Sequence, residues 1–406
     1  MTKKGVNRRE FITECSLKLA GASVLLNQSG AKPAFGKEKK PKPRKNKEPT
    51  MEYRSLGKTG LKVSAVSFGT THLRDPAVLL SAIDLGINFF DTAPSYAGGN
   101  SERMLGQVAK DYGREKIFIS TKIRAFEPEN KPSKKFRVLE HKALNLRMEG
   151  SLKQLQTDYV DVLFVGVMHM DWIVNEDLLS YLEKLKREGK ARFVGISHHE
   201  AGIYADVAEH VSKPNIYDVL LTWLDFQSPP EEIEALRKAR KKGVGIVAMK
   251  TQAGGYEVAK GSPLSSLSPH QAALKWVLNQ DFVDCAVPGM RNIEQIVENV
   301  GVVGKKMGWN DRKTLYAYHN AIKHKYCIMC GKCLKTCGNR INITTINRAL
   351  MYCEGHRDFE KGRRTYLKLS KRKSGLSCMN CPSPTCKCAN SITIAERMKL
   401  AHSLFA

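Results

Sequence analysis

The chain has 406 residues, and its 66 basic and 40 acidic side chains give a formal net charge of +26. The charge lies at the ends, because residues 1–50 carry 13 basic and 4 acidic side chains and residues 305–406 carry 21 and 5. The length allows one large domain and a smaller one. The nearly neutral middle argues against nucleic acid that wraps the whole protein. The basic ends would attract an acidic protein, an anionic membrane surface or RNA, but without aromatic residues interleaved among the basic ones we expect no nucleic-acid partner.

Residues 1–31 have the features of a targeting segment. The Arg8-Arg9 pair resembles a twin-arginine export signal, and an apolar run between Leu17 and Leu26 follows it. That run is short for a membrane span, and Ser29–Ala31 offers a small-residue cleavage site. We expect transient contact with the twin-arginine translocase and a periplasmic or membrane-associated protein. If the Arg pair belongs only to a basic tail, the protein stays cytoplasmic.

Residues 32–50 are rich in Lys and Pro and contain few apolar side chains. Such a segment cannot bury apolar surface, so we expect an extended linker. Contact with membrane headgroups is a second role for the same charges.

From Lys62 onward, short apolar runs alternate with helix-like stretches such as Leu178–Glu188 and Pro230–Lys241. Near-continuous apolar strands separated by helices are typical of a buried parallel sheet. The strand candidates are Val63–Phe68, Ile87–Phe90, Ile117–Ser120, Val160–Val165, Arg192–Gly195, Val219–Leu221, Gly245–Ala248 and Asp284–Val287. Eight strands predict an α/β fold, a (β/α)8 TIM barrel with its chemistry at the carboxyl ends of the strands.

Three polar residues follow two neighbouring strands: Asp91 and Tyr96 after one, and Lys122 at the end of the next. A phenol can donate a proton, a nearby ammonium lowers the pKa of the phenol, and a carboxylate holds the ammonium by a salt bridge. Each residue type by itself is commoner in structural roles. Their joint position at strand ends predicts a proton-transfer group.

Five segments in this order resemble the aldo/keto reductase family: Tyr53–Ser64, Phe68–Thr70, Asp91–Glu102, Gly189–Ser197 and Val287–Asn299. The resemblance covers roughly residues 51–304. It implies a TIM barrel that binds NADP or NAD without a Gly-rich Rossmann loop. It also implies that Tyr96 is the general acid, that Lys122 and Asp91 tune it, and that the substrate is a small carbonyl compound or alcohol. The cofactor-binding residues that it implies are Gly69, Thr70, Ser197, Gly289, Met290, Arg291, Asn292, Gln295, Glu298 and Asn299.

The main departure from the family concerns the catalytic histidine, because Gly166 stands at its position. His169 lies three residues further on and is the candidate for the missing role, while His198 and His199 are a second source of imidazole. Without a well-placed His, the carbonyl oxygen is oriented and stabilised less well. The barrel then takes a different substrate or is inactive.

The cofactor segment also departs from the family. Gly289 and Gln295 stand where members specific for NADPH often carry basic residues, and Arg291 can supply that charge. NADP and NAD therefore both stay open. Leu221 replaces a glutamine expected near the carboxamide, which leaves Ser197 as the better-matched contact.

Eight of the eleven cysteines form two close-spaced groups, a pattern that favours metal ligation over disulfides. The first group has the x2, x2, x3 spacing of a 4Fe–4S ferredoxin, in which the fourth Cys ligates the other cluster. We predict one 4Fe–4S cluster on Cys327, Cys330, Cys333 and Cys388, and a second on Cys378, Cys381, Cys386 and Cys337. Zinc is the alternative, but paired CxxC units would leave the third Cys of the first group unexplained.

Three cysteines, Cys15, Cys285 and Cys353, fall outside the groups and are expected to be small apolar fillers. The two groups end on similar stretches, residues 337–343 and 388–394, which indicates an internal repeat. Helices are expected at Ile346–Tyr352 and Phe359–Leu369 between them.

The sequence predicts four parts: a signal segment (1–31), a linker (32–50), a reductase-like barrel (51–304) and a small, mainly helical, ferredoxin-like domain (305–406). The leading hypothesis is a nicotinamide-dependent oxidoreductase linked to iron–sulfur electron transfer. The alternative is a catalytically degenerate barrel that binds ligands as a scaffold for an iron–sulfur electron carrier. In either case the basic run at 371–373 could steer an acidic electron-transfer protein.

Overall fold

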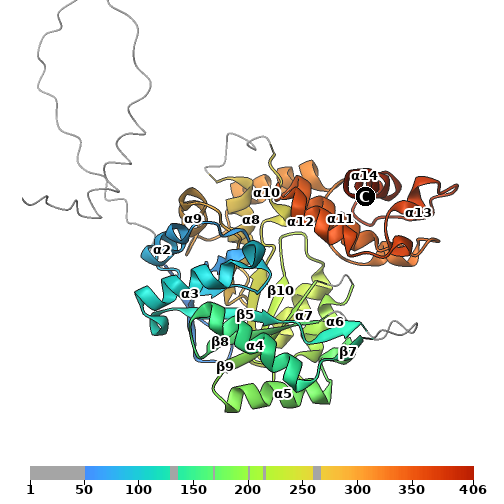
Figure 1. Ribbon diagram of the computed structural model, residues 1–406. Helices are drawn as coiled ribbons and strands as arrows, with labels where there is room; N and C mark the ends of the chain where they lie inside the picture. The colour runs from blue at the N-terminus through green and yellow to red at the C-terminus, as the bar shows by residue number, and fades with distance from the viewer. Residues whose placement is uncertain (1–50, 129–135, 168–169, 200–201, 214–215, 259–266) are drawn as a thin grey trace, which may run out of the picture. The chain divides into compact units, whose positions relative to one another are not determined.

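The computed structural model describes residues 51–128, 136–167, 170–199, 202–213, 216–258 and 267–406 (Figure 1). Every described residue belongs to one compact unit, Glu48–Ala406. The predicted signal segment and linker lie outside the described residues. Within the described ranges, no helix has the length and apolar character needed to cross a membrane.

Eight parallel strands form one sheet in the order β12-β11-β10-β9-β8-β5-β4-β3. Their bounds are β3 (Phe68–Gly69), β4 (Phe89–Asp91), β5 (Phe118–Ile123), β8 (Val160–Val167), β9 (Ala191–His198), β10 (Val219–Trp223), β11 (Gly245–Met249) and β12 (Cys285–Ala286). Parallel bridges from Val66 to Ala286 and from Gly69 to Gly289 link the first strand to the last. The sheet is therefore a nearly closed barrel, which confirms the predicted α/β fold.

A helix follows each strand of the barrel (Figure 1). The helices are α2 (Pro76–Asp84), α3 (Ser101–Tyr112), α4 (His141–Leu155), α5 (Glu176–Arg187), α6 (Tyr204–His210), α7 (Pro230–Lys241), α8 (Pro269–Leu278) and α9 (Ile293–Val300). Local sequence sets their starts: Pro230 opens α7, Ser268 and Gln271 form a capping box on α8, and Asn292 caps α9. Apolar side chains such as Leu105, Leu163 and Leu274 fill the space between the sheet and these helices.

The prediction of a single strand at Val63–Phe68 is wrong. Lys62–Ser64 is a short strand, β2, that pairs antiparallel with β1 (Tyr53–Ser55), and the barrel strand begins only at Phe68. Apolar side chains of this hairpin, including Leu56, Leu61 and Val63, pack with Phe89 and other inward-facing residues of the barrel. Residues 63–68 are all apolar or small because the first of them fill the barrel interior and the last belong to the barrel strand β3. A second hairpin pairs β6 (Phe126–Pro128) with β7 (Phe136–Val138).

Residues beyond the barrel form five helices, drawn orange to red in Figure 1. They are α10 (Trp309–Ile322), α11 (Ile343–Glu354), α12 (Phe359–Leu367), α13 (Leu376–Met379) and α14 (Ile394–Phe405). Helix α11 packs against α12 and α14 around Leu350, Met398 and Phe405. Gly362 permits this packing, since a Cβ there would lie 2.7 Å from the carbonyl oxygen of Ala349. The helices at Ile346–Tyr352 and Phe359–Leu369 were thus predicted within a few residues.

The sequence repeat at residues 337–343 and 388–394 recurs in the backbone. Arg340 and Ser391 occupy the same place in the two stretches and have left-handed φ angles of 50° and 64°. Each stretch then leads into a helix of 12 residues, α11 or α14. Each cysteine group is therefore joined to the helix that follows it by a stretch with the same backbone conformation.

A buried ion pair joins α10 to the barrel helix α8. Lys275 Nζ lies 2.6 Å from Asp311 Oδ2, and the two side chains are 8% and 10% exposed. The same carboxylate oxygen accepts from the backbone N–H of Gly308 at 2.7 Å, at the start of α10. Burial acts to raise the pKa of Asp311, but Lys275 and the Gly308 N–H outweigh it, so the pKa is lowered.

We expect Asp311→Asn to lower the free energy of unfolding by about 3 kcal/mol, because it leaves the Lys275 charge buried without its counter-ion. Urea unfolding at pH 7 measures the loss. Asp281→Asn, which removes a carboxylate that is 76% exposed, is the matched control and should stay within about 0.5 kcal/mol. The pKa of Asp311 is depressed in the folded protein. The difference in free energy of unfolding between wild type and Asp311→Asn is therefore fully present above about pH 4, the ordinary Asp value, and is lost as the pH falls through the native pKa. Equal stabilities at pH 7 would contradict the assignment.

Candidate active site

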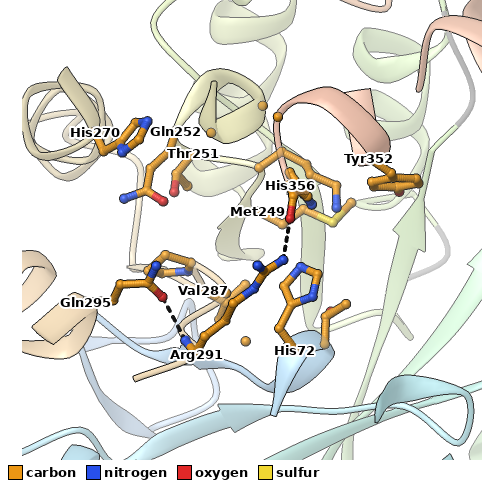
Figure 2. A pocket seen from close by; sticks show the side chains of 18 of the residues that line it. His72, Met249, Thr251, Gln252, His270, Val287, Arg291, Gln295, Tyr352 and His356 are labelled. Atoms are coloured by element: carbon orange, nitrogen blue, oxygen red, sulfur yellow. Dashed lines mark hydrogen bonds between the residues drawn. The ribbon is translucent and has the colours of Figure 1, made fainter. Parts of the chain in front are cut away.

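A cavity of about 300 Å³ lies at the carboxyl ends of the barrel strands (Figure 2). Asp91 and Tyr96 line it after β4, Lys250 lines it after β11, and Arg291 lines it after β12. The carboxyl ends of parallel strands meet at one edge of a barrel, so residues far apart in the sequence converge there. The cavity therefore lies at the edge of the barrel where the sequence predicted the site.

Lys122 is held inside the barrel by three acceptors. Its Nζ donates to both carboxylate oxygens of Asp91, at 2.7 and 2.6 Å, and to the carbonyl oxygen of Thr92 at 2.9 Å. The hydroxyl of Ser120 donates to the same carboxylate at 2.9 Å. Burial by itself would lower the pKa of Lys122, but Asp91 and Tyr96 together outweigh it and the pKa is raised. Lys122 is therefore a fixed positive charge at neutral pH.

Tyr96 lies next to this ion pair, in the short 3-10 helix η2 (Tyr96–Gly99). The Lys122 ammonium is 4.7 Å from the centroid of the Tyr96 ring. Burial raises the pKa of Tyr96 above its ordinary value, and Lys122 lowers it by less. The predicted lowering by Lys122 is present, but burial outweighs it. The phenol thus carries its proton at neutral pH, as a proton donor must.

The turn that carries Tyr96 has an unusual backbone. Ala97 and Gly98 follow it with φ angles of 50° and 66°. Glycine adopts this left-handed conformation without steric cost, and the turn sends the chain from β4 into α3.

Buried hydroxyls connect the loops after β3 and β4. Thr70 Oγ1 donates to the carbonyl oxygen of Asp91 at 3.0 Å, and Ser101 Oγ lies 2.6 Å from Thr70 Oγ1 and 2.8 Å from Thr92 Oγ1. Thr70, Thr92 and Ser101 are fully buried. Thr70, a residue predicted to bind the cofactor, therefore supports the Asp91 loop with its hydroxyl.

The other residues predicted to bind the cofactor divide into two sets. Gly69, Gly289, Arg291 and Gln295 line the cavity. Figure 2 shows Arg291 and Gln295 side by side, and the Gln295 side-chain oxygen accepts from the backbone N–H of Arg291 at 2.8 Å.

The second set is engaged within the protein. Asn292 caps α9 by accepting from the Gln295 N–H at 3.0 Å, and Asn299 accepts from Gln252 Nε2 at 2.9 Å. The Ser268 hydroxyl donates to Glu298. Ser197 and Met290 are buried. These contacts shape the segment around the cavity.

The structure describes two of the three histidines that the sequence offered in place of the one missing at Gly166. Gly166 is exposed, and a Cβ built on it would meet no atom within 4 Å, so open space stands where the family has its His. His169 lies outside the described residues. His198 is buried against the ring of Tyr204, with 4.3 Å between centroids, and burial lowers its pKa to about 3. His199 lines the cavity, and its carbonyl oxygen accepts from Arg348 of α11 at 2.7 Å.

Three other histidines in the cavity, His72, His270 and His356, were not predicted from the sequence. His72 and His356 face each other at 5.6 Å between ring centroids (Figure 2). Burial, followed by the charge of Lys361, lowers the pKa of His72 to about 3. His72 could have been suspected because it directly follows the Phe68–Thr71 segment. His356 could not, since nothing in its local sequence links it to the barrel.

Helices α11 and α12 contribute one wall of this cavity. Tyr352, His356 and Lys361 line it together with the barrel residues. Arg291 donates a hydrogen bond to the carbonyl oxygen of His356. The C-terminal part of the chain was predicted only as an electron-transfer module, and its part in the barrel site is a finding of the structure.

The ten cysteines in the described ranges are free thiols. Within those ranges, no three Cys, His, Asp or Glu side chains are arranged to hold a single metal ion. The thiols nevertheless lie in two neighbourhoods. Burial raises the pKa of Cys327 to about 12, and the nearby thiols of Cys333, Cys388 and Cys330 add to the rise.

In the second neighbourhood, burial raises the pKa of Cys378 to about 11, with further effects from Cys337, Cys386 and Cys381. The two cysteine runs are also joined directly, since Thr385 Oγ1 donates to the carbonyl oxygen of Thr336 at 2.7 Å. Each neighbourhood therefore draws thiols from both runs.

Tyr96 and Lys122, both partly buried, lie beside the buried Asp91 at the carboxyl ends of the strands, and this arrangement defines the class of protein as an α/β barrel with its site at that edge. Residues 74–263 match the profile of the aldo/keto reductase family. L-galactose dehydrogenase of Arabidopsis thaliana is 32% identical over 292 residues, which cover 62% of this chain and 88% of that protein. The chain belongs to the aldo/keto reductase family.

Other similar proteins agree with this assignment. An uncharacterized oxidoreductase of Bacillus subtilis, YrpG, is 29% identical over 305 residues, covering 62% of this chain and 91% of that protein. Among solved structures, the aldo-keto reductase AKR11C1 of Bacillus halodurans in its holo form has a TM-score of 0.54 and 23% identity, covering 66% of this chain and 96% of that one. At this identity the likeness supports the fold alone.

Proposed function

We propose that the protein is a nicotinamide-dependent oxidoreductase that reduces a carbonyl compound, or oxidises the corresponding alcohol, with Tyr96 as its proton donor. The observation that carries the proposal is the shared cavity. It joins Asp91 and Tyr96 with Gly289, Arg291 and Gln295, which the family resemblance assigns to the cofactor. A bound nicotinamide would supply or accept the hydride.

The residues around Tyr96 suit general acid catalysis. The neutral phenol donates its proton to the carbonyl oxygen as negative charge develops there, and the fixed Lys122 ammonium stabilises the resulting phenolate. Asp91 keeps that ammonium in place and charged through two hydrogen bonds. Because these groups are already ordered, little reorganisation is needed when the proton moves.

The residues in the cavity fit either nucleotide. Arg291 is positioned to pair with a 2′-phosphate, which favours NADP, but its side chain already donates to the carbonyl oxygen of His356. A phosphate would compete with that carbonyl for the guanidinium. We therefore propose NADP or NAD without choosing between them.

We also propose that the C-terminal helices hold two 4Fe–4S clusters, on the two sets of cysteines given above. The chemistry of the donors fits: eight free thiols lie in two neighbourhoods, and each draws on both runs. A cubane binds one thiolate on each of four irons, so its ligands stand further apart than ligands that share a single ion. Zinc would require the tighter arrangement. The clusters would supply one-electron transfer.

Two further proposals rest on the sequence. The Arg8-Arg9 segment favours export by the twin-arginine route, which carries folded proteins and so suits a chain that must first receive its clusters. Lys371, Arg372 and Lys373 are exposed, and such a basic surface favours an acidic electron-transfer partner.

A second candidate function is a scaffold barrel that binds a ligand without reducing it. The open space at Gly166 favours this function, because a Cβ at that position would meet no described atom within 4 Å. The ordered Tyr96, Lys122 and Asp91 favour the enzyme, since a barrel without chemistry would gain nothing from a buried charged pair.

An anaerobic titration of the iron–sulfur-loaded protein with NADPH and then NADH tests the proposal. We expect at least one nucleotide to bind, as measured by its fluorescence and by calorimetry. Simultaneous bleaching of the visible absorbance would mean that the barrel feeds electrons to the clusters, which requires a two-electron to one-electron converter. Binding without bleaching would support a reductase whose clusters serve another partner. Failure of both nucleotides to bind would overturn the reductase and leave the scaffold.

A further inference from the structure

Two lysines meet in the cavity where α11 and α12 contact the barrel. Lys250 follows β11, and Lys361 lies in the first turn of α12. Their ammonium groups are 5.1 and 4.5 Å from the centroid of the Tyr352 ring, which is labelled in Figure 2. The Tyr352 ring therefore attracts one cation from the barrel and one from the C-terminal helices.

Two carboxylates near these lysines are paired with other cations: Asp91 binds Lys122, and Glu257 binds Arg357. A third, Asp358, acts to raise the pKa of Lys361 without forming an ion pair with it, and its Oδ1 accepts from the Lys361 backbone N–H at 2.9 Å. In the part of the chain that the structure describes, neither Lys250 nor Lys361 forms an ion pair.

The two lysines are also partly buried in the wall of the cavity. Burial lowers the pKa of Lys250 and of Lys361 to about 8, and Lys250 lowers that of Lys361 further. Partly buried positive charge without a paired counter-ion is costly, and the cost is offset when an anion binds. A cavity of this kind is therefore suited to a negatively charged ligand group.

The backbone fixes the two lysines relative to each other. Gly254, in the loop after β11, and Gly355, at the end of α11, touch directly: a Cβ on Gly355 would lie 2.1 Å from the Gly254 carbonyl oxygen. No side chain fits at Gly355, so the loop that follows Lys250 and the segment that precedes Lys361 are held in contact. Such ordering before a ligand arrives reduces the entropy lost on binding.

We propose that Lys250 of the barrel and Lys361 of α12, which both approach the Tyr352 ring, form a binding site for an anionic group, a phosphate or a carboxylate. The inference rests on the proposed function, because the same cavity holds Tyr96. The anion belongs either to a phosphate of the nicotinamide dinucleotide or to an acidic substrate. In both cases the C-terminal helices supply part of the ligand site.

Calorimetric titration of the full, cluster-loaded chain with inorganic pyrophosphate tests this site. Lys250→Met and Lys361→Met should each raise the Kd by about tenfold, the usual effect of losing a hydrogen bond to a charged group. Arg363→Met removes one exposed charge from the same helix and should change the Kd by less than about twofold. Lys361→Arg keeps the charge and should retain most of the affinity. Equal affinity in wild type and both Met variants, or no binding to wild type, would overturn the site.

Titrations of the same variants with NADPH and NADH separate the two sources of the anion. Nucleotide affinity that falls in parallel with pyrophosphate affinity assigns the site to the dinucleotide. Unchanged nucleotide affinity, with pyrophosphate binding lost, assigns it to an acidic substrate. Lysine-dependent pyrophosphate binding without any nucleotide binding would overturn the reductase proposal while supporting the anion site. Thermal unfolding of each variant shows that the fold is kept.

Discussion

Replacing Tyr96 with Phe is expected to lower kcat/KM for carbonyl reduction by about 100-fold to 10 000-fold, the range that a positioned general acid contributes. The substitution removes one oxygen and keeps the ring, so the contact between the ring and the Lys122 ammonium at 4.7 Å can persist. The affinity for the nucleotide should stay within about threefold, because the phenol acts on the substrate oxygen and the nucleotide is held by other residues. Steady-state rates and nucleotide titrations measure the two effects separately.

The matched control is Tyr112→Phe, which removes the same atom from an exposed tyrosine at the end of α3. It should leave kcat/KM unchanged. Because burial raises the pKa of Tyr96, the wild-type phenol remains protonated through the neutral range, so the rate of reduction should fall only in alkaline solution. A Tyr96→Phe protein with wild-type turnover would exclude this phenol as the acid, and the scaffold function would then be the better account.

Much of the barrel could be predicted because its strands are apolar on both faces. Val160–Val165 and Val219–Leu221 read as continuous buried runs, and each lies inside an observed strand, β8 or β10. The prediction failed at Val63–Phe68, where a hairpin strand and a barrel strand follow each other without a break in hydrophobicity. Periodicity reports burial, and it cannot tell which surface a buried residue faces.

The active site was predicted only in part, for a related reason. Asp91, Tyr96 and Lys122 stand near one another in the sequence, and the order of the strands brings them together. Lys361 and His356 come from the helices beyond the barrel, and their place in the cavity depends on how two folded parts dock. No local pattern encodes such docking. Close approach at Gly355, which only the structure reveals, makes it possible.

The pairing of cysteines across the two runs gives the second large effect. We expect Cys330→Ser to remove one cluster, which is about four of about eight irons per chain, because three thiolates hold a cubane poorly. Cys353→Ser is the matched control, since Cys353 is a partly buried thiol packed against the same apolar core but outside both groups. It should keep the full iron content. Iron analysis and visible absorbance of anaerobically loaded protein give the measurement.

Double variants then decide which thiols share a cluster. If Cys330 and Cys388 belong to one cluster, as the neighbourhood of Cys327 indicates, Cys330→Ser/Cys388→Ser should lose no more iron than either single variant. Cys330→Ser/Cys337→Ser should instead lose both clusters, although these two residues lie in the same run. Ligation within each run predicts the reverse pattern for the two double variants. Full iron retention in Cys330→Ser would argue against a cluster at the first group. A protein that binds zinc in place of iron would instead support the zinc site that the sequence left as the alternative.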